Sequence, residues 1–290
     1  MPKNGELPDP DDKMRVGQHA LRNEGGCGGM FRRSGGPGAP MSNVSSVLHL
    51  IEPLKSETQP LRFRARQPLI RRGELPTAVW YIEDGWSARF KLLRDGRRHI
   101  SRFYAPGDIC DLSWLVAGAA DQSVMTLTPL RAVRIDRTRL DARLRNDAAL
   151  GFALAREALA EMRWQAEWLV TIGCKSAAER IAHFLCELYL RLERRGKTRE
   201  TSCDFPLSQQ DIADFTGMTS VHACRTLREL RNSGVIELCR RRLRIVDFSR
   251  LVRMAAFDAN YLEEPMTAAG AGLAAPGHRT ATPECRPAAC

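Results

Sequence analysis

The sequence has no CxxC pair and no apolar run as long as a membrane-spanning helix. Its nine cysteines have spacings that suit neither a zinc site nor a compact iron–sulfur cluster, so we expect reduced thiols and no metal site. No apolar segment of the signal-peptide kind follows the first residues. These absences predict a cytoplasmic protein without a membrane partner.

Positive charge is in excess. The 290 residues include 44 Lys and Arg against 34 Asp and Glu, which gives a net charge of +10. Such an excess suits an anionic partner but does not identify one.

The length allows two modest domains, each with its own core. Residues 1–42 and 263–290 are rich in Gly, Pro or Ala and predict disordered tails; an over-extended gene start is an alternative for the first.

The stretch from 206 to 246 has the most informative pattern. Ser208 is a hydroxyl N-cap, and Asp211 stands three residues later and completes a capping box. Gly217 permits a sharp turn to a second helix, which Thr219 caps and Gly234 follows. This order is typical of a helix-turn-helix, whose second helix enters the major groove of double-stranded DNA.

The second helix, residues 219–233, has two different faces. Three apolar residues at helical spacing predict its buried stripe: Ala223, Leu227 and Leu230. Five residues lie on the opposite face: Ser220, Val221, Cys224, Arg225 and Arg228. The apolar segments 235–238 and 243–246, joined by the basic turn 239–242, predict a β-hairpin wing. An ordinary helical hairpin with a solvated cationic face is the alternative, but caps, turn, stripe and wing occur together.

Short strands separated by turns dominate residues 61–140. The Asp-Gly pair at 95–96 predicts a hairpin between strands at 87–93 and 99–104, and residues 106–108 predict another turn. Further strands are expected at 79–82, 123–127 and 132–135. Strands so short, with turns so frequent, favour a jelly roll or barrel over a parallel sheet.

One long helix is expected from about 146 to 171. Six residues form a heptad seam along one side: Phe152, Ala155, Leu159, Met162, Ala166 and Leu169. A second stripe lies beside it: Leu154, Ala158, Glu161, Gln165, Trp168 and Ile172. We expect the seam to face a second copy and the second stripe to cover the strands. Burial within a monomer is the alternative.

Gly173 and Cys174 predict the end of the helix and a hinge, and Ser176 with Glu179 predicts a capping box for the next helix.

These elements predict an α+β chain. Its parts are a disordered tail at 1–42, a jelly-roll sensor domain at 43–145, and a dimerisation helix with its hinge at 146–173. A winged helix-turn-helix domain at 174–262 and a second disordered tail at 263–290 follow.

This order of parts resembles the Crp–Fnr superfamily of bacterial transcription regulators over about residues 61–257. The likeness is carried by Tyr81–Gly85, Asp95–Arg98 and Pro106–Asp108 in the roll, and by Leu207–Ala213 and Arg225–Leu227 in the helix-turn-helix. It implies a cyclic-nucleotide-binding-like β-roll and a homodimer on a near-palindromic promoter site. It also implies RNA polymerase as a further partner.

The resemblance also implies roles for single residues. Arg225 is expected to bind a guanine, because its guanidinium fork matches O6 and N7, with Ser220 and Val221 at neighbouring base edges. Val221 stands where family members often carry Glu, so the preferred site need not be that of the cyclic-AMP receptor. Phosphate contacts are expected from five residues: Ser208, Gln210, Thr219, His222 and Arg228.

The roll departs from the superfamily's cyclic-nucleotide binders. Those proteins hold the ribose with the Glu of a Gly-Glu-Leu segment and the phosphate with the Arg of an Arg-Ser/Thr-Ala segment. The matching positions of the effector pocket are Asp111, Gln122 and Ser123, and Gln122 brings no charge to offset a phosphate. We therefore expect no cyclic nucleotide and no cofactor, and the effector stays unidentified. Haem stays an open alternative, although His99 is the roll's one histidine and is expected at the surface.

Other functions stay open beside the regulator. One is a constitutive or architectural DNA-binding protein with a degenerate sensor, and another is a cupin-like metal enzyme, which a single roll histidine does not support. No catalytic residue is expected. Cys224 adjoins Arg225 on the exposed helix face, where positive charge favours the thiolate, so peroxide oxidation is a hypothesis for a redox switch. The plainer interpretation is a small residue that allows close approach to the DNA backbone.

Overall fold

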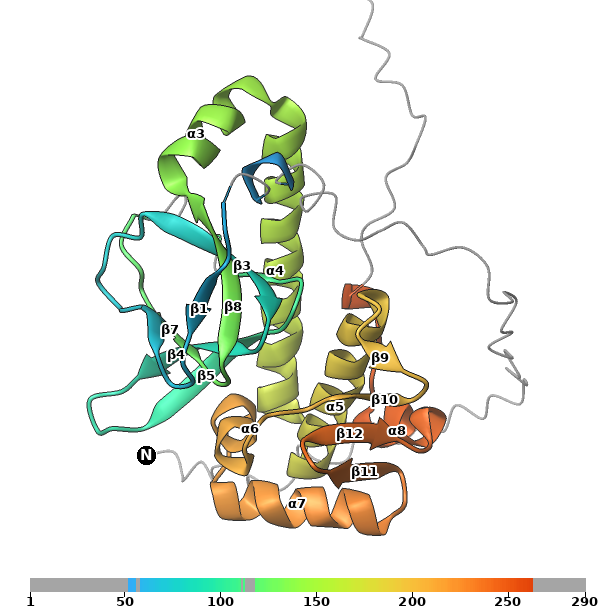
Figure 1. Ribbon diagram of the computed structural model, residues 1–290. Helices are drawn as coiled ribbons and strands as arrows, with labels where there is room; N and C mark the ends of the chain where they lie inside the picture. The colour runs from blue at the N-terminus through green and yellow to red at the C-terminus, as the bar shows by residue number, and fades with distance from the viewer. Residues whose placement is uncertain (1–51, 56–57, 111, 113–117, 263–290) are drawn as a thin grey trace, which may run out of the picture. The chain divides into compact units, whose positions relative to one another are not determined.

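The computed structural model describes residues 52–55, 58–110, 112 and 118–262 (Figure 1). Both predicted tails lie outside these residues. The strands of the first half are β1 (Leu61–Phe63), β2 (Pro68–Ile70), β3 (Ala78–Asp84), β4 (Ser87–Leu92), β5 (Arg98–Tyr104), β6 (Ile109–Cys110), β7 (Ser123–Thr126) and β8 (Leu130–Asp136). They pair antiparallel in two sheets, in the orders β1-β8-β3-β6 and β2-β7-β4-β5, which confirms the predicted roll.

Two glycines make the turns of the roll possible. Gly96, in the β4–β5 hairpin, has φ +85°, a left-handed conformation that side chains other than glycine rarely adopt. Gly85, between β3 and β4, has φ +87°, and a Cβ there would lie 2.2 Å from the carbonyl oxygen of Pro129. The close packing of this turn on the start of β8 therefore requires glycine. This requirement explains why the Tyr81–Gly85 segment ends in a glycine.

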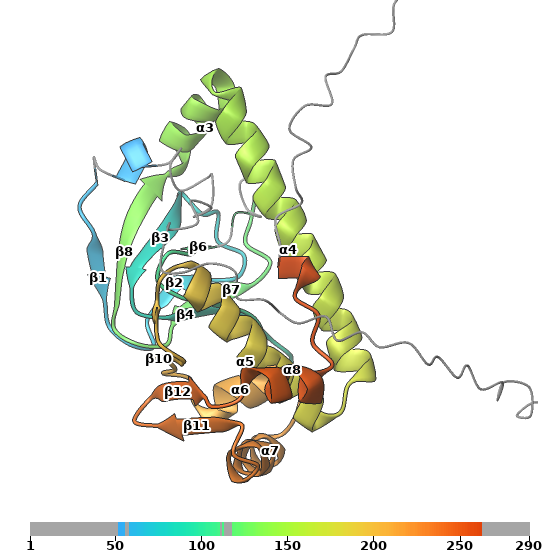
Figure 2. The ribbon, with the colours of Figure 1, turned by 90° about the vertical axis from the view of Figure 1, so that its right-hand side faces the viewer.

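The helical region differs from the single helix that the sequence predicts. A separate helix, α3 (Arg137–Asn146), follows β8 with Asp136 as its N-cap, and α4 (Ala148–Cys174) begins after the N-cap Asp147 (Figures 1 and 2). Gly173 and Cys174 are predicted to end the long helix; α4 runs through Gly173 and ends at Cys174, so the position of the break differs by one residue. Lys175 is the C-cap of α4, and its extended backbone leads into Ser176, the N-cap of the next helix.

The buried side of α4 is also shifted by about one residue from the predicted stripe. Ala158 and Gln165 are exposed, whereas Trp164, absent from that stripe, is buried beside Trp168. The predicted stripe and the row that is actually buried both have residues three and four positions apart. The two rows share Glu161 and Trp168, so the spacing alone does not distinguish them. The bulk of Trp164 decides between the rows, because a large aromatic side chain gains the most from burial.

The second half continues with α5 (Ala177–Arg194), capped by Ser176 and Glu179 as predicted. Its further elements are β9 (Thr198–Arg199), β10 (Ser202–Asp204), α6 (Gln209–Thr216), α7 (Ser220–Asn232), β11 (Ile236–Cys239), β12 (Arg242–Ile245), α8 (Phe248–Ala255) and the 3₁₀ turn η2 (Asn260–Leu262). The strands form one antiparallel sheet in the order β11-β12-β10-β9.

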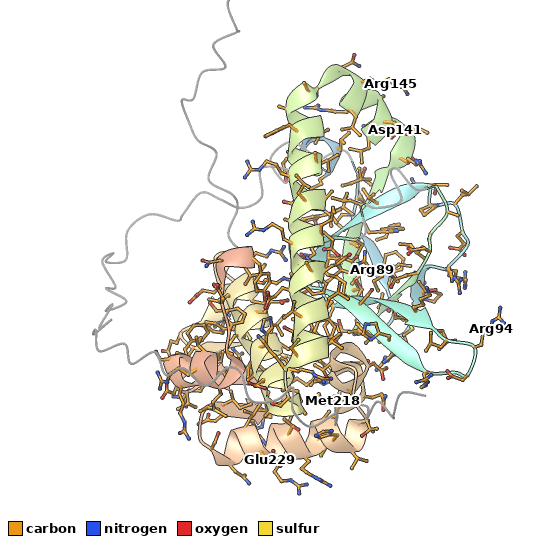
Figure 3. All side chains as sticks on the ribbon, turned by 180° about the vertical axis from the view of Figure 1, so that it is seen from behind. Arg89, Arg94, Asp141, Arg145, Met218 and Glu229 are labelled. Atoms are coloured by element: carbon orange, nitrogen blue, oxygen red, sulfur yellow. The ribbon has the colours of Figure 1, made fainter. Side chains whose placement is uncertain are left out.

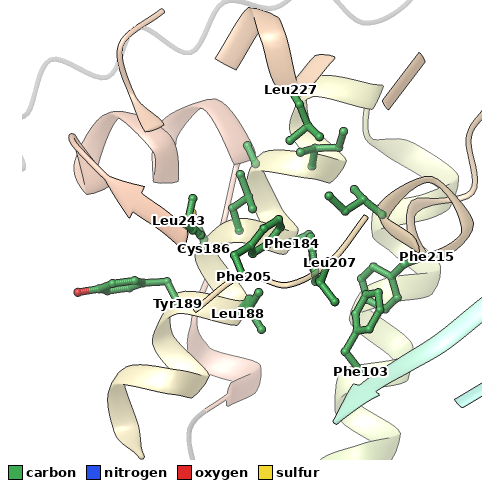
Figure 4. Close-up of a cluster of buried hydrophobic side chains, with 14 of the residues drawn as sticks. Phe103, Phe184, Cys186, Leu188, Tyr189, Phe205, Leu207, Phe215, Leu227 and Leu243 are labelled. Atoms are coloured by element: carbon green, nitrogen blue, oxygen red, sulfur yellow. The ribbon is translucent and has the colours of Figure 1, made fainter. Parts of the chain in front are cut away.

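One hydrophobic cluster joins the roll to this second half. Phe184 of α5 and Phe215 of α6 have ring centroids 4.8 Å apart, and Phe103 of β5 lies 5.0 Å from Phe215 (Figure 4). Trp168 of α4 packs on Phe215 at 4.3 Å. The helix-turn-helix is therefore packed on both the roll and the long helix.

Candidate DNA-binding site

The first helix of the motif begins and ends as its sequence predicts. The Ser208 hydroxyl accepts from the Asp211 backbone N–H at 3.1 Å, and the Asp211 carboxylate accepts from the Ser208 N–H at 3.1 Å. Gly217 closes the helix in the left-handed region at φ +69°. The capping box and the glycine turn are thus both confirmed.

The second helix, α7, separates a buried face from an exposed one. Thr219 caps it by accepting from the His222 N–H at 3.3 Å. The predicted stripe of Ala223, Leu227 and Leu230 is buried, together with Thr226, which the sequence analysis did not include. Val221 is 70 % exposed, and Figure 3 shows Glu229 pointing away from the rest of the molecule.

The exposed face of α7 carries two arginines that are not engaged elsewhere. Arg225 and Arg228 are exposed, and neither makes a hydrogen bond or ion pair within the described part of the chain. Ser220 and Cys224 are half-buried on the same side of the helix. A guanidinium without an intramolecular acceptor is free to bind base edges or phosphates.

The wing places further positive charge beside this face. Its tip, Arg240-Arg241, joins Cys239 to Arg242, and both tip residues have positive φ, at +48° and +63°. Such a two-residue turn normally favours Asn and Gly, so arginine here costs about 1 kcal/mol or more per residue. A groove of about 240 Å³ separates the wing from α7 and is lined by Cys224, Arg231 and Arg240–Arg242 among others.

Most of the predicted phosphate contacts already have intramolecular roles. Ser208 and Thr219 are N-caps, and the Gln210 amide donates to Asp214 at 2.6 Å. His222 and Arg228 are exposed on α7. The five residues therefore gather at the starts of α6 and α7 and on the outer face of α7, where backbone N–H groups also favour anions.

Arginines of the roll hold α6 in place. Arg98 of β5 donates to Asp211 at 2.7 Å and to Asp214 at 2.6 Å, and Arg66 lies 3.6 Å from Asp211. Burial favours a raised pKa for Asp211, but the Ser208 hydroxyl and the Arg98 guanidinium outweigh it and hold this pKa below its usual value. The sequence showed only the capping role of Asp211, because its partner lies 113 residues away.

Two of the three residues predicted to line the effector pocket, Gln122 and Ser123, belong to the described residues. Asp111 lies outside the described residues. Gln122 uses its carbonyl oxygen to accept from the Ser101 hydroxyl at 2.6 Å, and the Ser123 hydroxyl accepts from the Arg72 backbone N–H at 3.0 Å. Gln122 and Ser123 therefore already have partners in the roll.

A charged cluster that the sequence analysis missed lies between the roll and α4. Glu161 accepts from Arg89 of β4 at 2.8 Å and pairs with Arg102 of β5 at 2.7 Å; Figure 3 shows Arg89 beside the long helix. The Arg102 guanidinium lies over the Trp164 ring at 4.5 Å. Burial favours a raised pKa for Glu161, but Arg102 and Arg89 hold that pKa below its usual value.

Within the described residues, no group of His, Cys, Asp and Glu could hold a metal ion, and no helix is long and apolar enough to cross a membrane. His99, expected at the surface, is half-buried in β5.

Comparisons with known proteins agree with this architecture. Residues 179–254 match the Crp-like helix-turn-helix domain, and residues 60–147 match the cyclic nucleotide-binding domain. The nitrogen fixation regulation protein FixK of Azorhizobium caulinodans is 33% identical over 67% of this chain and 78% of its own length. The transcriptional activator protein FnrL of Cereibacter sphaeroides is 27% identical over 68% of this chain and 81% of its own length.

A solved structure of FixK2 from Bradyrhizobium japonicum has a TM-score of 0.61 and 25% identity, over 68% of this chain and 96% of that one. Together with the capped helix-turn-helix, the basic wing and the antiparallel roll, these matches identify the chain as a member of the Crp–Fnr family of transcription regulators, which bind DNA and are not enzymes.

Proposed function

We propose that this regulator is a homodimer that reads a near-palindromic promoter site through α7. The observation that carries the proposal is the outer side of α4. Four large apolar side chains lie there at heptad spacing and are 59–76 % exposed: Phe152, Leu159, Met162 and Leu169. Exposing four large apolar side chains to water is unfavourable. Packing against the same seam of a second copy would bury them.

A two-fold dimer through this seam would place two copies of α7 on one side of the assembly. Each copy would read one half-site with Arg225, Val221 and Ser220, and Ser208, Gln210, Thr219, His222 and Arg228 would position the backbone. RNA polymerase is the further partner that a promoter-bound regulator implies.

Selection from a random duplex library tests this function. The full-length chain should enrich an inverted repeat whose half-sites are centred about 10 bp apart, one helical turn. Enrichment of a single asymmetric element would contradict the homodimer, and no enrichment over random sequence would favour an architectural role.

We further propose that the roll does not bind cyclic nucleotides. Gln122 is uncharged and already bonded to Ser101, and Glu161 already occupies both Arg89 and Arg102. A native-state ligand at about 100 times its Kd adds about 2.7 kcal/mol of stability. We expect no rise in Tm with cyclic AMP or cyclic GMP; a concentration-dependent rise with either nucleotide would contradict this proposal.

Cys224 remains our hypothesis for a redox switch. Its thiol is half-buried at the groove between α7 and the wing, close to where DNA would lie. Peroxide should lower operator affinity of the wild type and spare Cys224→Ser, because a sulfinate or sulfonate would repel DNA phosphates. Cys239→Ser, which removes an exposed thiol from the same groove, is the matched control. Equal loss in wild type and Cys224→Ser, or no loss in either, would exclude Cys224 as the sensor.

A further inference from the structure

A buried carboxylate on α5 binds two indoles of the long helix. Glu187 is 1 % exposed, and its Oε1 accepts from Trp164 Nε1 at 2.7 Å. Its Oε2 accepts from Trp168 Nε1 at 2.7 Å and from the Tyr261 hydroxyl at 2.8 Å. Trp164 and Trp168 are one turn apart, so a single carboxylate fixes two successive turns of α4 against α5.

The negative charge of Glu187 is balanced by Arg191, which also contacts Asp108 of the roll. Arg191, one turn further along α5, lies 3.7 Å from Glu187 and 3.3 Å from Asp108. Asp108 ends the Pro106–Asp108 turn and also pairs with Arg195 at 2.5 Å. Burial favours a raised pKa for Asp108, but Arg195 and Arg191 hold that pKa well below its usual value. Anions this deeply buried are stable only while each partner keeps its position.

We call the contact of Glu187 with Trp164, Trp168 and Tyr261 the junction. The turn after α8, which carries Tyr261, packs against the other side of this junction. The Tyr261 hydroxyl donates its hydrogen bond to Glu187, so its oxygen accepts from His183 Nε2 at 3.0 Å, and His183 Nδ1 accepts from Lys175 at 2.8 Å. Burial, aided by Lys175, lowers the pKa of His183 to about 3, which keeps the ring neutral in this role. The peptide oxygen of Asn260 accepts from Arg163 of α4 at 2.7 Å, so η2 bridges both helices; Figure 2 shows it beside α4.

These contacts lie between α4, which carries the proposed dimer seam, and α5, on which the recognition helix α7 packs. The proposed dimer seam lies on α4, and α7 packs on α5 within the same hydrophobic cluster. Together with the contacts of Arg98 and Phe103 to α6, the α4–α5 angle therefore contributes to where each recognition helix points relative to the proposed two-fold axis. The junction residues lie on α4, α5 and η2, whereas the base-reading side chains lie on α7, so an effect of the junction on DNA binding must be indirect.

We propose that Glu187 is a positioning residue that sets the α4–α5 angle, with Tyr261 as the strap that holds its carboxylate, and so sets the separation of the two recognition helices. The inference rests on the homodimer proposed above. It predicts that the junction controls affinity for two half-sites at the correct spacing but not for one half-site.

Tyr261→Phe tests this in the full-length chain. The variant keeps the ring and removes one hydroxyl, which leaves Glu187 and His183 each one partner short. Two duplexes are compared, the inverted repeat selected by the wild type and the same duplex with one half-site scrambled. Affinity for the repeat should fall about tenfold, the size expected for one hydrogen bond to a charged group, and affinity for the single half-site should not change.

Tyr189→Phe is the matched control. Tyr189 is also on α5 and likewise loses its hydroxyl, whose one proton is shared between the Glu200 carbonyl at 3.0 Å and the Glu193 carboxylate at 3.2 Å, and these acceptors lie outside the junction. It should leave both affinities unchanged. Equal losses for the two variants, or a Tyr261→Phe loss that is the same on both duplexes, would show a general loss of stability and overturn the positioning role.

Tryptophan emission separates failure of this inference from failure of the homodimer. If the wild type binds both duplexes equally, the homodimer is wrong, and the junction is then judged on emission alone. Tyr261→Phe and Glu187→Gln should both shift the emission of Trp164 and Trp168, whereas Tyr189→Phe should not. Unshifted emission in both junction variants would overturn the inference whatever the oligomeric state.

Discussion

Met162→Glu should convert the protein to a monomer that no longer binds its paired-site duplex. Met162 is 64 % exposed at the middle of the α4 seam, and in a two-fold dimer it would be buried against the partner helix. Two carboxylates buried there without partners cost several kcal/mol, which exceeds what the seam can offset. Sedimentation gives the oligomeric state, and titration of the paired-site duplex gives the affinity. Leu159→Glu, one turn away on the same seam, should have the same effect.

Ala160→Glu is the control for this substitution. Ala160 is exposed on α4 but lies off the seam, so the added carboxylate stays in water and the dimer should persist. Both variants should keep the helical content of a folded chain, and only Met162→Glu should lose the part of the Tm that rises with protein concentration. A wild type that sediments as a monomer, both free and on DNA, would end the homodimer proposal.

Arg225→Ala should lose discrimination at one base pair in each half-site. A bidentate arginine–guanine contact is worth about 1–3 kcal/mol of discrimination against the wrong base. Arg225 is exposed and unengaged within the described residues, so its replacement removes no internal contact that we describe and should leave the Tm unchanged. The measurement is affinity for the selected duplex and for duplexes with each base pair changed in turn.

Arg228→Ala distinguishes base reading from general attraction. Arg228 is equally exposed on α7, and a phosphate contact there would weaken binding to all duplexes by a similar factor and lower the salt dependence. If Arg225→Ala instead weakens specific and random duplexes equally, its role is attraction and not base reading.

The local features of the chain were predictable from sequence because each depends on residues three or four positions apart. The Ser208 and Asp211 capping box, the left-handed Gly217 and the buried Leu227 are set by helix geometry and backbone sterics alone. Gly85 was recognised as part of a motif, but its cause is the Pro129 carbonyl that passes 2.2 Å from where a Cβ would stand.

By itself, the sequence determined the order of the parts: a strand-rich roll, a long helix and a capped helix-turn-helix with a basic wing. Only the tertiary structure decided which side of α4 faces the roll, because two rows of the helix have the same periodicity and Trp164 selects between them. Only the tertiary structure also revealed the pairings of Arg98 with Asp211, Asp108 with Arg195, and Glu187 with Trp164 and Trp168. These groups lie 19 to 113 residues apart, and their burial is favourable only when distant segments bring the partners together.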